Sequence, residues 1–209
     1  KQLDDLLHKA KSKKHKIILV TAHRRENWGE PLRNICRALK ELVSLRSDIV
    51  IIYPVHLNPN VKKPVYEILG KTPRVLLIPP LDYQQFVDYL SRSYLVITDS
   101  GGVQEEAPSL GKPVFVLREI TERPEAVKKG TAKVIGTKAR HICLEVNKLL
   151  NNQKEYKRMA RAVNPYGDGK AADRIVKILL HHFNLSEAIV SPTLSPACSA
   201  GERAATNAI

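Results

Sequence analysis

The sequence is poor in cysteine and contains no long apolar run. Only three of its 209 residues are cysteine, and Cys36, Cys143 and Cys198 have neither the spacing of a disulfide framework nor that of a metal site. A reducing, cytoplasmic compartment is therefore the simpler expectation. No uninterrupted apolar stretch reaches the length of a membrane span, and no secretory signal is recognisable. We accordingly expect no association with a membrane.

Methionine is scarcer still, since Met159 is the only one and the chain begins with Lys1. We therefore expect the sequence to be a piece of a longer protein whose translation starts elsewhere. The length allows one sizeable hydrophobic core, with or without tails. Hydrophobic residues make up 43% of the chain, which is enough for a globular domain.

The chain is strongly basic, with a formal net charge of +13 and a pI near 9.7. Such an excess can attract nucleic acid, an anionic membrane or a polyanionic small ligand. However, the basic residues are dispersed, apart from a lysine cluster within residues 9–16. No zinc-finger spacing, aromatic RNA-binding signature or basic zipper accompanies them. We therefore expect a solvated basic surface and no nucleic-acid partner.

Short apolar runs rich in β-branched residues alternate with segments of helical periodicity. This alternation is typical of a parallel sheet buried on both faces, so the sequence predicts a doubly wound, Rossmann-like α/β domain. Helices are expected after Pro31, before Gly70 and around Phe86, and helices again dominate after Gly136. The predicted strands are residues 17–21, 49–53, 75–78, 94–98, 114–117 and 132–135.

Three parts of the chain are expected from these patterns. Residues 1–15 form a linker or N-terminal helix, 16–185 the folded domain and 186–209 a disordered tail rich in Ser, Ala and Pro. Before the last helix, Gly167 and Gly169 are expected to adopt unusual backbone angles, and Asp168 to cap the helix.

The run TDSGGVQEEA at residues 98–107 joins the end of a buried strand to two glycines and then to a helical segment. Glycines allow the backbone to turn its N–H groups outward without a Cβ penalty, and a following helix points its positive end at the same place. Ser100, Gly101 and Gly102 are therefore candidates for a phosphate or diphosphate cradle. Taken alone, a glycine pair after a strand is more often an ordinary turn.

Four further motifs accompany this loop: TAHRREN at 21–27, YPVHLN at 53–58, TERPEA at 121–126 and NPYGDG at 164–169. Together, from about residue 17 to 183, they closely resemble the second half of the non-hydrolysing UDP-N-acetylglucosamine 2-epimerases of bacteria and archaea. The resemblance implies the C-terminal, UDP-binding domain of a two-domain GT-B-type architecture. It also implies that the last helix crosses back toward the missing N-terminal domain.

The family's chemistry explains why an anion cradle is needed. These enzymes interconvert UDP-GlcNAc and UDP-ManNAc by eliminating UDP, which leaves a glycal, and then adding UDP back with the C2 proton on the other face. The diphosphate must be held while it leaves and returns, and preorganised N–H groups and cations stabilise such developing charge. By resemblance, the acid and base that handle the C2 proton belong mainly to the absent first half.

Several residues match family positions around UDP. The N–H groups of the glycine loop would meet the diphosphate, and Glu106 would accept hydrogen bonds from the ribose hydroxyls. His23 matches a histidine near the diphosphate that can assist proton transfer, and Arg123 an arginine that closes on the nucleotide. Ordinary alternatives exist: Glu106 as an exposed helix residue, His23 as a structural histidine, and Arg123 as a surface arginine paired with Glu122 or Glu125.

Leu81 and Phe86 match the region that packs along the uracil, although Leu81 replaces a glutamine common in the family. For Phe86 the alternative is ordinary helix core. Arg24 and His56 match positions that, in several bacterial members, contact a second, regulatory UDP-GlcNAc. The alternative is that both simply line the cleft.

The resemblance implies UDP and UDP-GlcNAc as ligands, the missing N-terminal domain as partner, and a homodimer at full length. No cofactor and no metal are expected, because the seven histidines show no ligand spacing. Two other functions remain open at this point. One is a nucleotide-sugar glycosyltransferase of the same architecture, and the other is a non-catalytic UDP-sugar-binding module.

Overall fold

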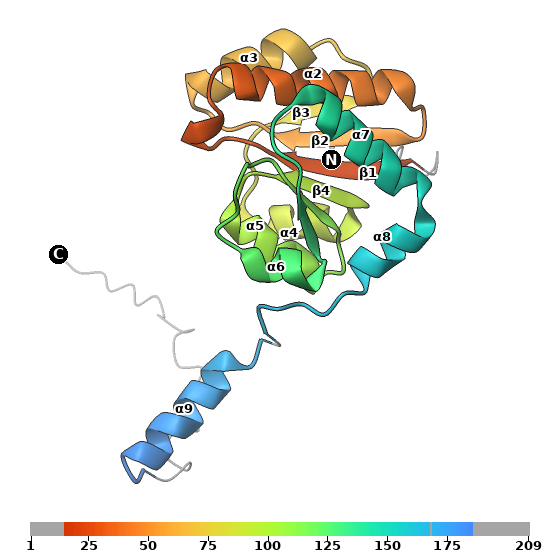
Figure 1. Ribbon diagram of the computed structural model, residues 1–209. Coiled ribbons are helices and arrows are strands. Elements are labelled where there is room, and N and C mark those ends of the chain that lie inside the picture. Colours follow the sequence, from red (N-terminus) through yellow and green to blue (C-terminus); the bar gives the residue numbers. More distant parts are fainter. Residues whose placement is uncertain (1–14, 168, 186–209) are drawn as a thin grey trace, which may run out of the picture. The chain divides into compact units, whose positions relative to one another are not determined.

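Our computed structural model describes residues 15–167 and 169–185, which divide into two compact units at residue 167. The first unit is built on a six-stranded, wholly parallel sheet with strand order β3-β2-β1-β4-β5-β6 (Figure 1). This is the doubly wound α/β fold that the sequence predicts. The expected linker over 1–15, except His15, and the expected tail over 186–209 lie outside the described residues. The strands are β1 (Lys16–Thr21), β2 (Ile49–Pro54), β3 (Val75–Ile78), β4 (Leu95–Thr98), β5 (Val114–Val116) and β6 (Ala132–Val134).

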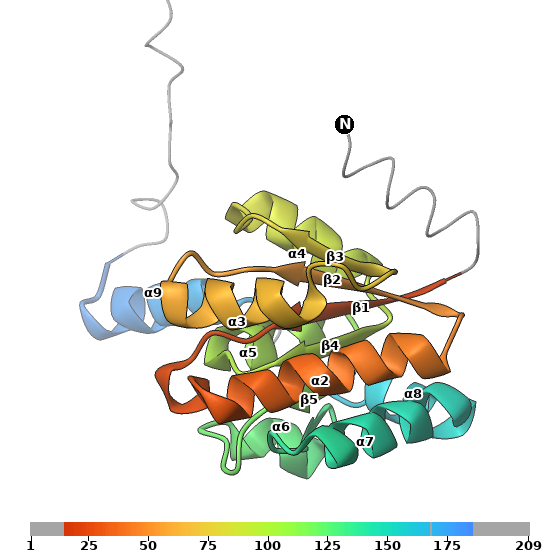
Figure 2. The same cartoon turned by 90° about the horizontal axis from the view of Figure 1, so that it is seen from above.

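The helices of this unit cover both faces of the sheet. One layer, seen from above in Figure 2, consists of α2 (Glu30–Leu45), α3 (Pro59–Leu69) and α7 (Ala139–Asn151), and the other of α4 (Tyr83–Arg92), α5 (Gly101–Ser109) and α6 (Pro124–Lys129). A short 3-10 helix, η1 (Arg25–Asn27), follows β1, and α8 (Gln153–Ala160) follows α7.

Two hydrophobic cores result from this layering, one on each side of the sheet. Along β1 the side chains alternate: Ile18 and Val20 belong to the core with α2, α3 and α7, whereas Ile17 and Leu19 belong to the core with α4, α5 and α6. Both alternating sets are buried, which explains why the strand is a continuous apolar run rather than an alternation with polar residues.

The predicted strands differ from the observed ones by no more than one residue at either end. Tyr94, Leu117 and Ile135 were included in the prediction but lie just outside β4, β5 and β6. Each still donates its N–H to a neighbouring strand residue, at 2.7 to 2.9 Å. The differences therefore concern the ends of the ladder rather than its pairing.

The first helix begins, as predicted, with Pro31 in its first turn. In the second unit, Gly167 and Gly169 have φ values of 108° and 79°, which confirms the expected unusual backbone angles. The predicted cap at Asp168 lies outside the described residues. The helix α9 (Ala171–His182) follows, and its Ile175, Ile178 and Leu179 side chains are exposed.

The order of the strands determines where a ligand can bind. The chain leaves β1 toward α2 on one face of the sheet and leaves the neighbouring β4 toward α5 on the other (Figure 1). The loops after these two strands therefore diverge, and open α/β sheets bind ligands at such a switch point, beyond the carboxyl ends of the strands. Among the described residues, none of the helices is both long and apolar enough to cross a membrane.

Candidate functional site

A cavity of about 200 Å³ lies at the switch point, beyond the carboxyl ends of β1, β2 and β4. We call it the sheet-edge cavity. It contains five of the predicted site residues, which come from five separate loops or helices: His23, His56, Leu81, Phe86 and Ser100. Its other lining residues are Thr21, Pro54, Pro80 and Val103.

A second, more open cavity of about 490 Å³ adjoins the first, and we call it the arginine cavity. It contains Arg24 and His56, the two residues predicted to contact a second ligand molecule. Its other lining residues are His23, Arg25, Glu26, Trp28 and Asn58. His23 and His56 line both cavities, so the two predicted ligand groups share one wall.

The shared wall is a pair of stacked imidazole rings. The ring centroids of His23 and His56 are 5.4 Å apart, and the rings are inclined by 18°. The His56 ring and the His23 backbone are held by neighbours: Asn58 donates its backbone N–H to Nδ1 of His56 at 3.1 Å, and Trp28 donates its indole N–H to the carbonyl of His23 at 3.1 Å. The stack therefore belongs to a defined arrangement of the two loops.

The glycine loop forms the start of α5, with Ser100 at the N-cap position. Contrary to expectation, the Ser100 N–H does not face outward, because it donates to the Thr98 hydroxyl at 2.9 Å. Neither Gly101 nor Gly102 has a positive φ, so the loop does not use the left-handed backbone region. Their missing side chains instead leave space in front of the first N–H groups of the helix, which have no acceptor within it.

Two arginines converge on this helix start. A Cβ atom placed on Gly101 would lie 3.9 Å from a guanidinium nitrogen of Arg24 and 3.9 Å from one of Arg123. The side-chain ion pair of Arg123 is with Glu105 of α5, which raises the pKa of its guanidinium, and its Nη1 also donates to the backbone carbonyl of Glu122 at 3.1 Å. A carboxylate oxygen of Glu122 lies at 4.0 Å from the same Gly101 Cβ position, so two cations and one anion flank the positive end of the helix. The two guanidinium groups and the helix start favour an anionic ligand.

Glu106 lies one turn along α5, and its Oε1 is 3.8 Å from the Cβ position of Gly102. The carboxylate thus stands beside the glycine loop, although it does not line either cavity. Burial, followed by the neighbouring charge of Glu105, raises the pKa of Glu106 above its ordinary value. Leu81 and Phe86 are partly buried against the α4 side of the core and also line the sheet-edge cavity, so core packing and ligand contact are compatible.

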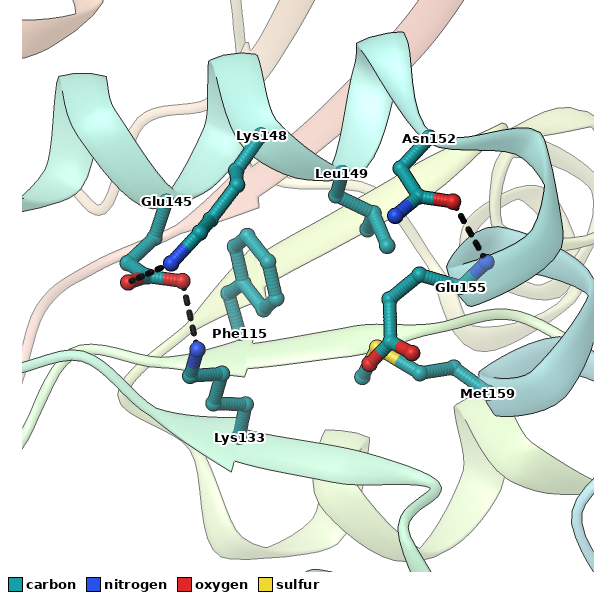
Figure 3. A pocket seen from close by; sticks show the side chains of 8 residues that line it. All are labelled: Phe115, Lys133, Glu145, Lys148, Leu149, Asn152, Glu155 and Met159. Carbon is teal, nitrogen blue, oxygen red and sulfur yellow. Dashed lines mark hydrogen bonds and ion pairs between the residues drawn. The ribbon is translucent and has the colours of Figure 1, made fainter.

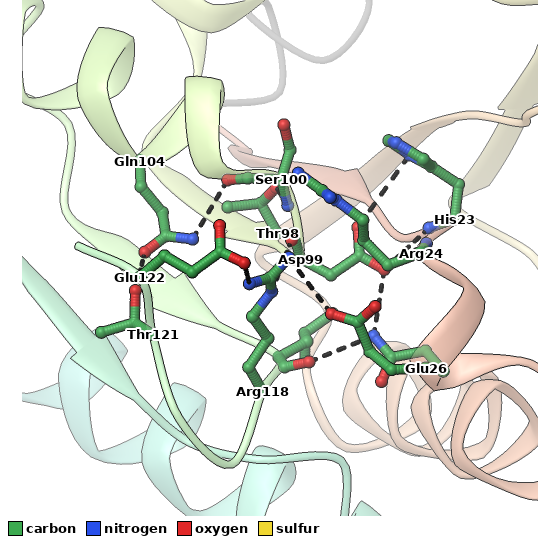
Figure 4. A network of polar contacts seen from close by, with 12 residues as sticks. His23, Arg24, Glu26, Thr98, Asp99, Ser100, Gln104, Arg118, Thr121 and Glu122 are labelled. Atoms are coloured by element: carbon green, nitrogen blue, oxygen red, sulfur yellow. Dashed lines mark hydrogen bonds and ion pairs between the residues drawn. The ribbon is translucent and has the colours of Figure 1, made fainter.

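The residue that organises these loops is Asp99, which the sequence reading did not single out. It is fully buried between the end of β4 and the glycine loop. Its Oδ2 accepts the backbone N–H groups of His23 and Arg24, each at 2.8 Å, and the side-chain amide of Asn27 at 3.0 Å (Figure 4). A single carboxylate oxygen therefore joins the loop after β1 to the loop after β4.

Arg118 makes a second connection that the sequence did not indicate. Its side chain is only 6% exposed, and Nε donates to the Asp99 carbonyl at 2.9 Å. The same guanidinium forms ion pairs with Glu26 of η1 at 3.1 Å and with Glu122 after β5 at 3.4 Å (Figure 4). Arg118 thus links three loops that border the site.

The environment of His23 favours the neutral form of its imidazole. Burial has the largest influence and lowers its pKa from 6.5, Asp99 acts in the opposite direction, and His56 and Arg24 lower it further. A neutral imidazole carries one N–H donor and one acceptor nitrogen, so it can hold or take up a proton beside a bound anion.

Comparison with known proteins decides the family. The sequence model described as UDP-N-acetylglucosamine 2-epimerase matches residues 1–180. The chain belongs to the UDP-N-acetylglucosamine 2-epimerase family. A Campylobacter jejuni UDP-N-acetylglucosamine 2-epimerase is 54% identical over 165 residues, which cover 79% of this chain and 43% of that protein. The chain thus spans about half the length of the curated relatives it matches.

This epimerase-family chain likewise covers only about half of the solved epimerase structures that it matches. The UDP-GlcNAc 2-epimerase of Neisseria meningitidis, solved with UDP-GlcNAc bound, has a TM-score of 0.79 and 44% identity over 86% of this chain and 49% of its own. WaaG, a glycosyltransferase of lipopolysaccharide biosynthesis, has a TM-score of 0.61 at 15% identity. The second likeness shows the fold alone, so the glycosyltransferase alternative has no support beyond shared architecture.

Another pocket of the epimerase-family chain, between α7, α8 and the edge strand β6, has a similar volume of about 200 Å³ (Figure 3). Its charged residues already have partners: Glu145, which is buried, pairs with both Lys133 and Lys148, and Glu155 pairs with Arg158. None of the predicted site residues lies there, so this pocket is no rival to the sheet-edge cavity. Among residues 15–167 and 169–185, no three His, Cys, Asp or Glu side chains are grouped as metal ligands.

Proposed function

We propose that this chain is the UDP-binding half of an enzyme that interconverts UDP-GlcNAc and UDP-ManNAc by elimination and re-addition of UDP. The observation that carries the proposal is a helix start, opened by two glycines, that lies beside two arginines and whose N-cap residue Ser100 lines one cavity together with His23, in a chain of the epimerase family. An anionic leaving group is favoured by such an arrangement because its donors are already in place.

In this proposal the diphosphate occupies the start of α5. The N–H groups of Gly101 and Gly102, the Ser100 hydroxyl and the Arg123 guanidinium bind its oxygens, and His23 exchanges a proton with it as it leaves and returns. The Ser100 contribution comes from the hydroxyl, since its N–H is already donated to Thr98. The hydroxyl makes no cap hydrogen bond to the helix, which leaves it available to a ligand.

The uridine part of the nucleotide is attached to one end of the diphosphate through its ribose. We assign the ribose hydroxyls to Glu106, next to Gly102, and the uracil to the Leu81 and Phe86 surface. We assign the arginine cavity, with Arg24 and His56, to a second UDP-GlcNAc that regulates the enzyme. Because the two cavities share the histidine stack, binding in one would be coupled to binding in the other, and this coupling is reciprocal.

We further propose that residues 16–185 act with an N-terminal domain onto which α9 crosses, and that the complete protein is a homodimer. The relatives are about twice as long as this chain, which leaves room for such a domain. The free thiols of Cys36 and Cys143 are both buried and fit a reducing, cytoplasmic location.

The proposal is tested first by calorimetric titration of the chain with UDP, with CDP as the comparison. We expect saturable UDP binding and no exchange of the C2 hydrogen of UDP-GlcNAc in heavy water, since the C2 acid and base are assigned to the other half. Exchange catalysed by this chain alone would place that chemistry here. Adding the first half of the C. jejuni relative to the chain should produce exchange. If that mixture binds UDP but still catalyses no exchange, the chain is better explained as a non-catalytic module.

Gly101→Ala provides a sharper test, because the structure separates its effects on folding and on binding. The new methyl group would sit at ordinary contact distance, 3.9 Å, from the two arginines. Alanine also favours a helix by about 0.5–1 kcal/mol over glycine, so thermal stability should not fall. The methyl group would nevertheless stand in front of the N–H groups, and UDP affinity should drop at least about tenfold, or about 1.4 kcal/mol. Unchanged affinity would refute the assigned position of the diphosphate.

A further inference from the structure

Asp99 uses its two carboxylate oxygens unequally. Oδ2 accepts three hydrogen bonds, from the backbone N–H groups of His23 and Arg24 and from the Asn27 amide. Oδ1 is equally buried and has no hydrogen-bond partner among the described residues. Native proteins seldom leave a buried oxygen of a charged group without a donor, so the position of Oδ1 calls for a functional explanation.

The side chain of His23 is a candidate donor for this oxygen. Its Nδ1 lies 3.9 Å from Oδ1, which is beyond a normal hydrogen bond but close enough for attraction, and a small rotation of the ring would shorten it. The histidine backbone cannot shift freely, because its N–H is held by Oδ2 of the same carboxylate. One aspartate therefore controls both the main chain of His23 and one edge of its ring.

We propose that Asp99 is a positioning residue that keeps the proton of neutral His23 on Nδ1 and so presents an unprotonated Nε2 at the opposite edge of the ring. The ring nitrogen next to an anionic carboxylate oxygen is favoured as the N–H donor, and the other ring nitrogen becomes the acceptor. When Nε2 takes up a proton, the resulting positive charge faces the Asp99 carboxylate, which stabilises it.

The proposal rests on the proposed function only for its catalytic consequence. Under that function, Nε2 is the nitrogen that holds the proton exchanged with the diphosphate, and Asp99 also adjoins Ser100, the first residue of the glycine loop. The carboxylate thereby fixes the histidine relative to the place where the diphosphate would bind. The tautomer itself depends only on the contact between Asp99 and His23, and it can be measured without any nucleotide.

Three charged or titratable groups face His23 and set its protonation. Asp99 follows β4, His56 follows β2, and Arg24 is the next residue in the same loop. The two basic groups disfavour a protonated imidazole, and Asp99 is the group that opposes them. Removing its charge should therefore move the titration of His23 to lower pH.

The decisive measurement is a nitrogen-15 NMR titration of the histidine side chains of the chain, without nucleotide. In the unaltered protein, neutral His23 should carry its proton on Nδ1. An Nε2-protonated ring would overturn the proposal directly, and this result requires no variant to fold.

Asp99→Asn sharpens the test, because an asparagine can keep its oxygen toward the His23 and Arg24 N–H groups while turning its NH₂ toward Nδ1. A donor at that position should move the ring proton to Nε2 and shift the titration to lower pH. The matched control is Glu145→Gln, which removes another buried carboxylate far along the sequence, on α7, and should leave the tautomer and titration of His23 unchanged.

UDP binding separates this proposal from the proposed function. At a pH where His23 is neutral, UDP affinity of Asp99→Asn should change by less than about threefold while the tautomer switches. If UDP fails to bind even the unaltered chain, the proposed function fails and the tautomer result still decides the role of Asp99. If UDP binds and the tautomer of Asp99→Asn equals that of the unaltered chain, the positioning role is wrong.

Discussion

Replacement of Arg118 by methionine should destabilise the first unit substantially. Methionine keeps an unbranched apolar stem in the buried space and removes the guanidinium that donates to the Asp99 carbonyl at 2.9 Å. The lost hydrogen bond has a charged donor and leaves a buried acceptor without it, a change that costs about 1.5–3 kcal/mol. The unfolding free energy should fall by at least that amount.

The two ion pairs of Arg118 add less. The side chains of Glu26 and Glu122 are 52% and 64% exposed, so both carboxylates regain water when the arginine is removed. Pairs with exposed partners contribute about 0–1 kcal/mol each. The total loss is therefore about 1.5–5 kcal/mol, which corresponds to a decrease of roughly 0.8–2.5 M in the urea midpoint if the slope is about 2 kcal/mol per M.

Urea denaturation followed by circular dichroism measures this loss. Arg118→Lys should recover only part of it, because an ammonium cannot match the planar fork that reaches three partners. The control is Arg37→Met, which removes an exposed arginine paired with Glu30 on α2 and should change stability by less than about 0.5 kcal/mol. If Arg118→Met behaved like this control, Arg118 would not connect the loops energetically.

Three other outcomes are expected. Glu106→Gln should weaken UDP binding by about 1–3 kcal/mol in calorimetry, and equal binding would exclude the ribose role. The folded-state pKa of His23 lies below 6.5, so the unfolded chain binds more protons than the folded chain just below that pH. The urea midpoint should therefore fall as the pH is lowered below 6.5. The fall should be smaller in His23→Gln. Exposed Ile175, Ile178 and Leu179 should make the chain self-associate or bind a hydrophobic dye, whereas a clean monomer by light scattering without dye binding would contradict the crossover of α9.

The architecture could be predicted from the sequence because its signals are local. Each strand is a short, continuous apolar run, and each predicted helix has an apolar stripe with a recognisable start such as Pro31. The positions of His23, Phe86 and Ser100 around one cavity also follow, since residues after parallel strands meet at one edge of the sheet.

The connections among the loops could not be predicted in the same way. Asp99 and Asn27 are 72 positions apart, and nothing near either residue indicates that the carboxylate accepts the amide. Arg118 looks like any basic residue after a strand until the fold places it under Glu26 and Glu122. The hydrogen bond from the Ser100 N–H to the Thr98 hydroxyl could not be predicted for a related reason. The Thr98 hydroxyl is itself hydrogen-bonded, at 2.6 Å, to the hydroxyl of Thr21 on another strand.

The strand order also has a consequence for how the chain folds. Strands β1, β2 and β3 are made before β4, and β1 finds its second partner only when β4 appears, with Thr21 and Thr98 separated by 77 positions. Closing so long a loop is slow, and until then β1 is an apolar edge open to wrong pairing. Both sides of the sheet-edge cavity come together only at this late step. A nascent chain that stops before β4 therefore has no cavity in which UDP could bind and stabilise the fold. We expect such chains to depend on chaperones.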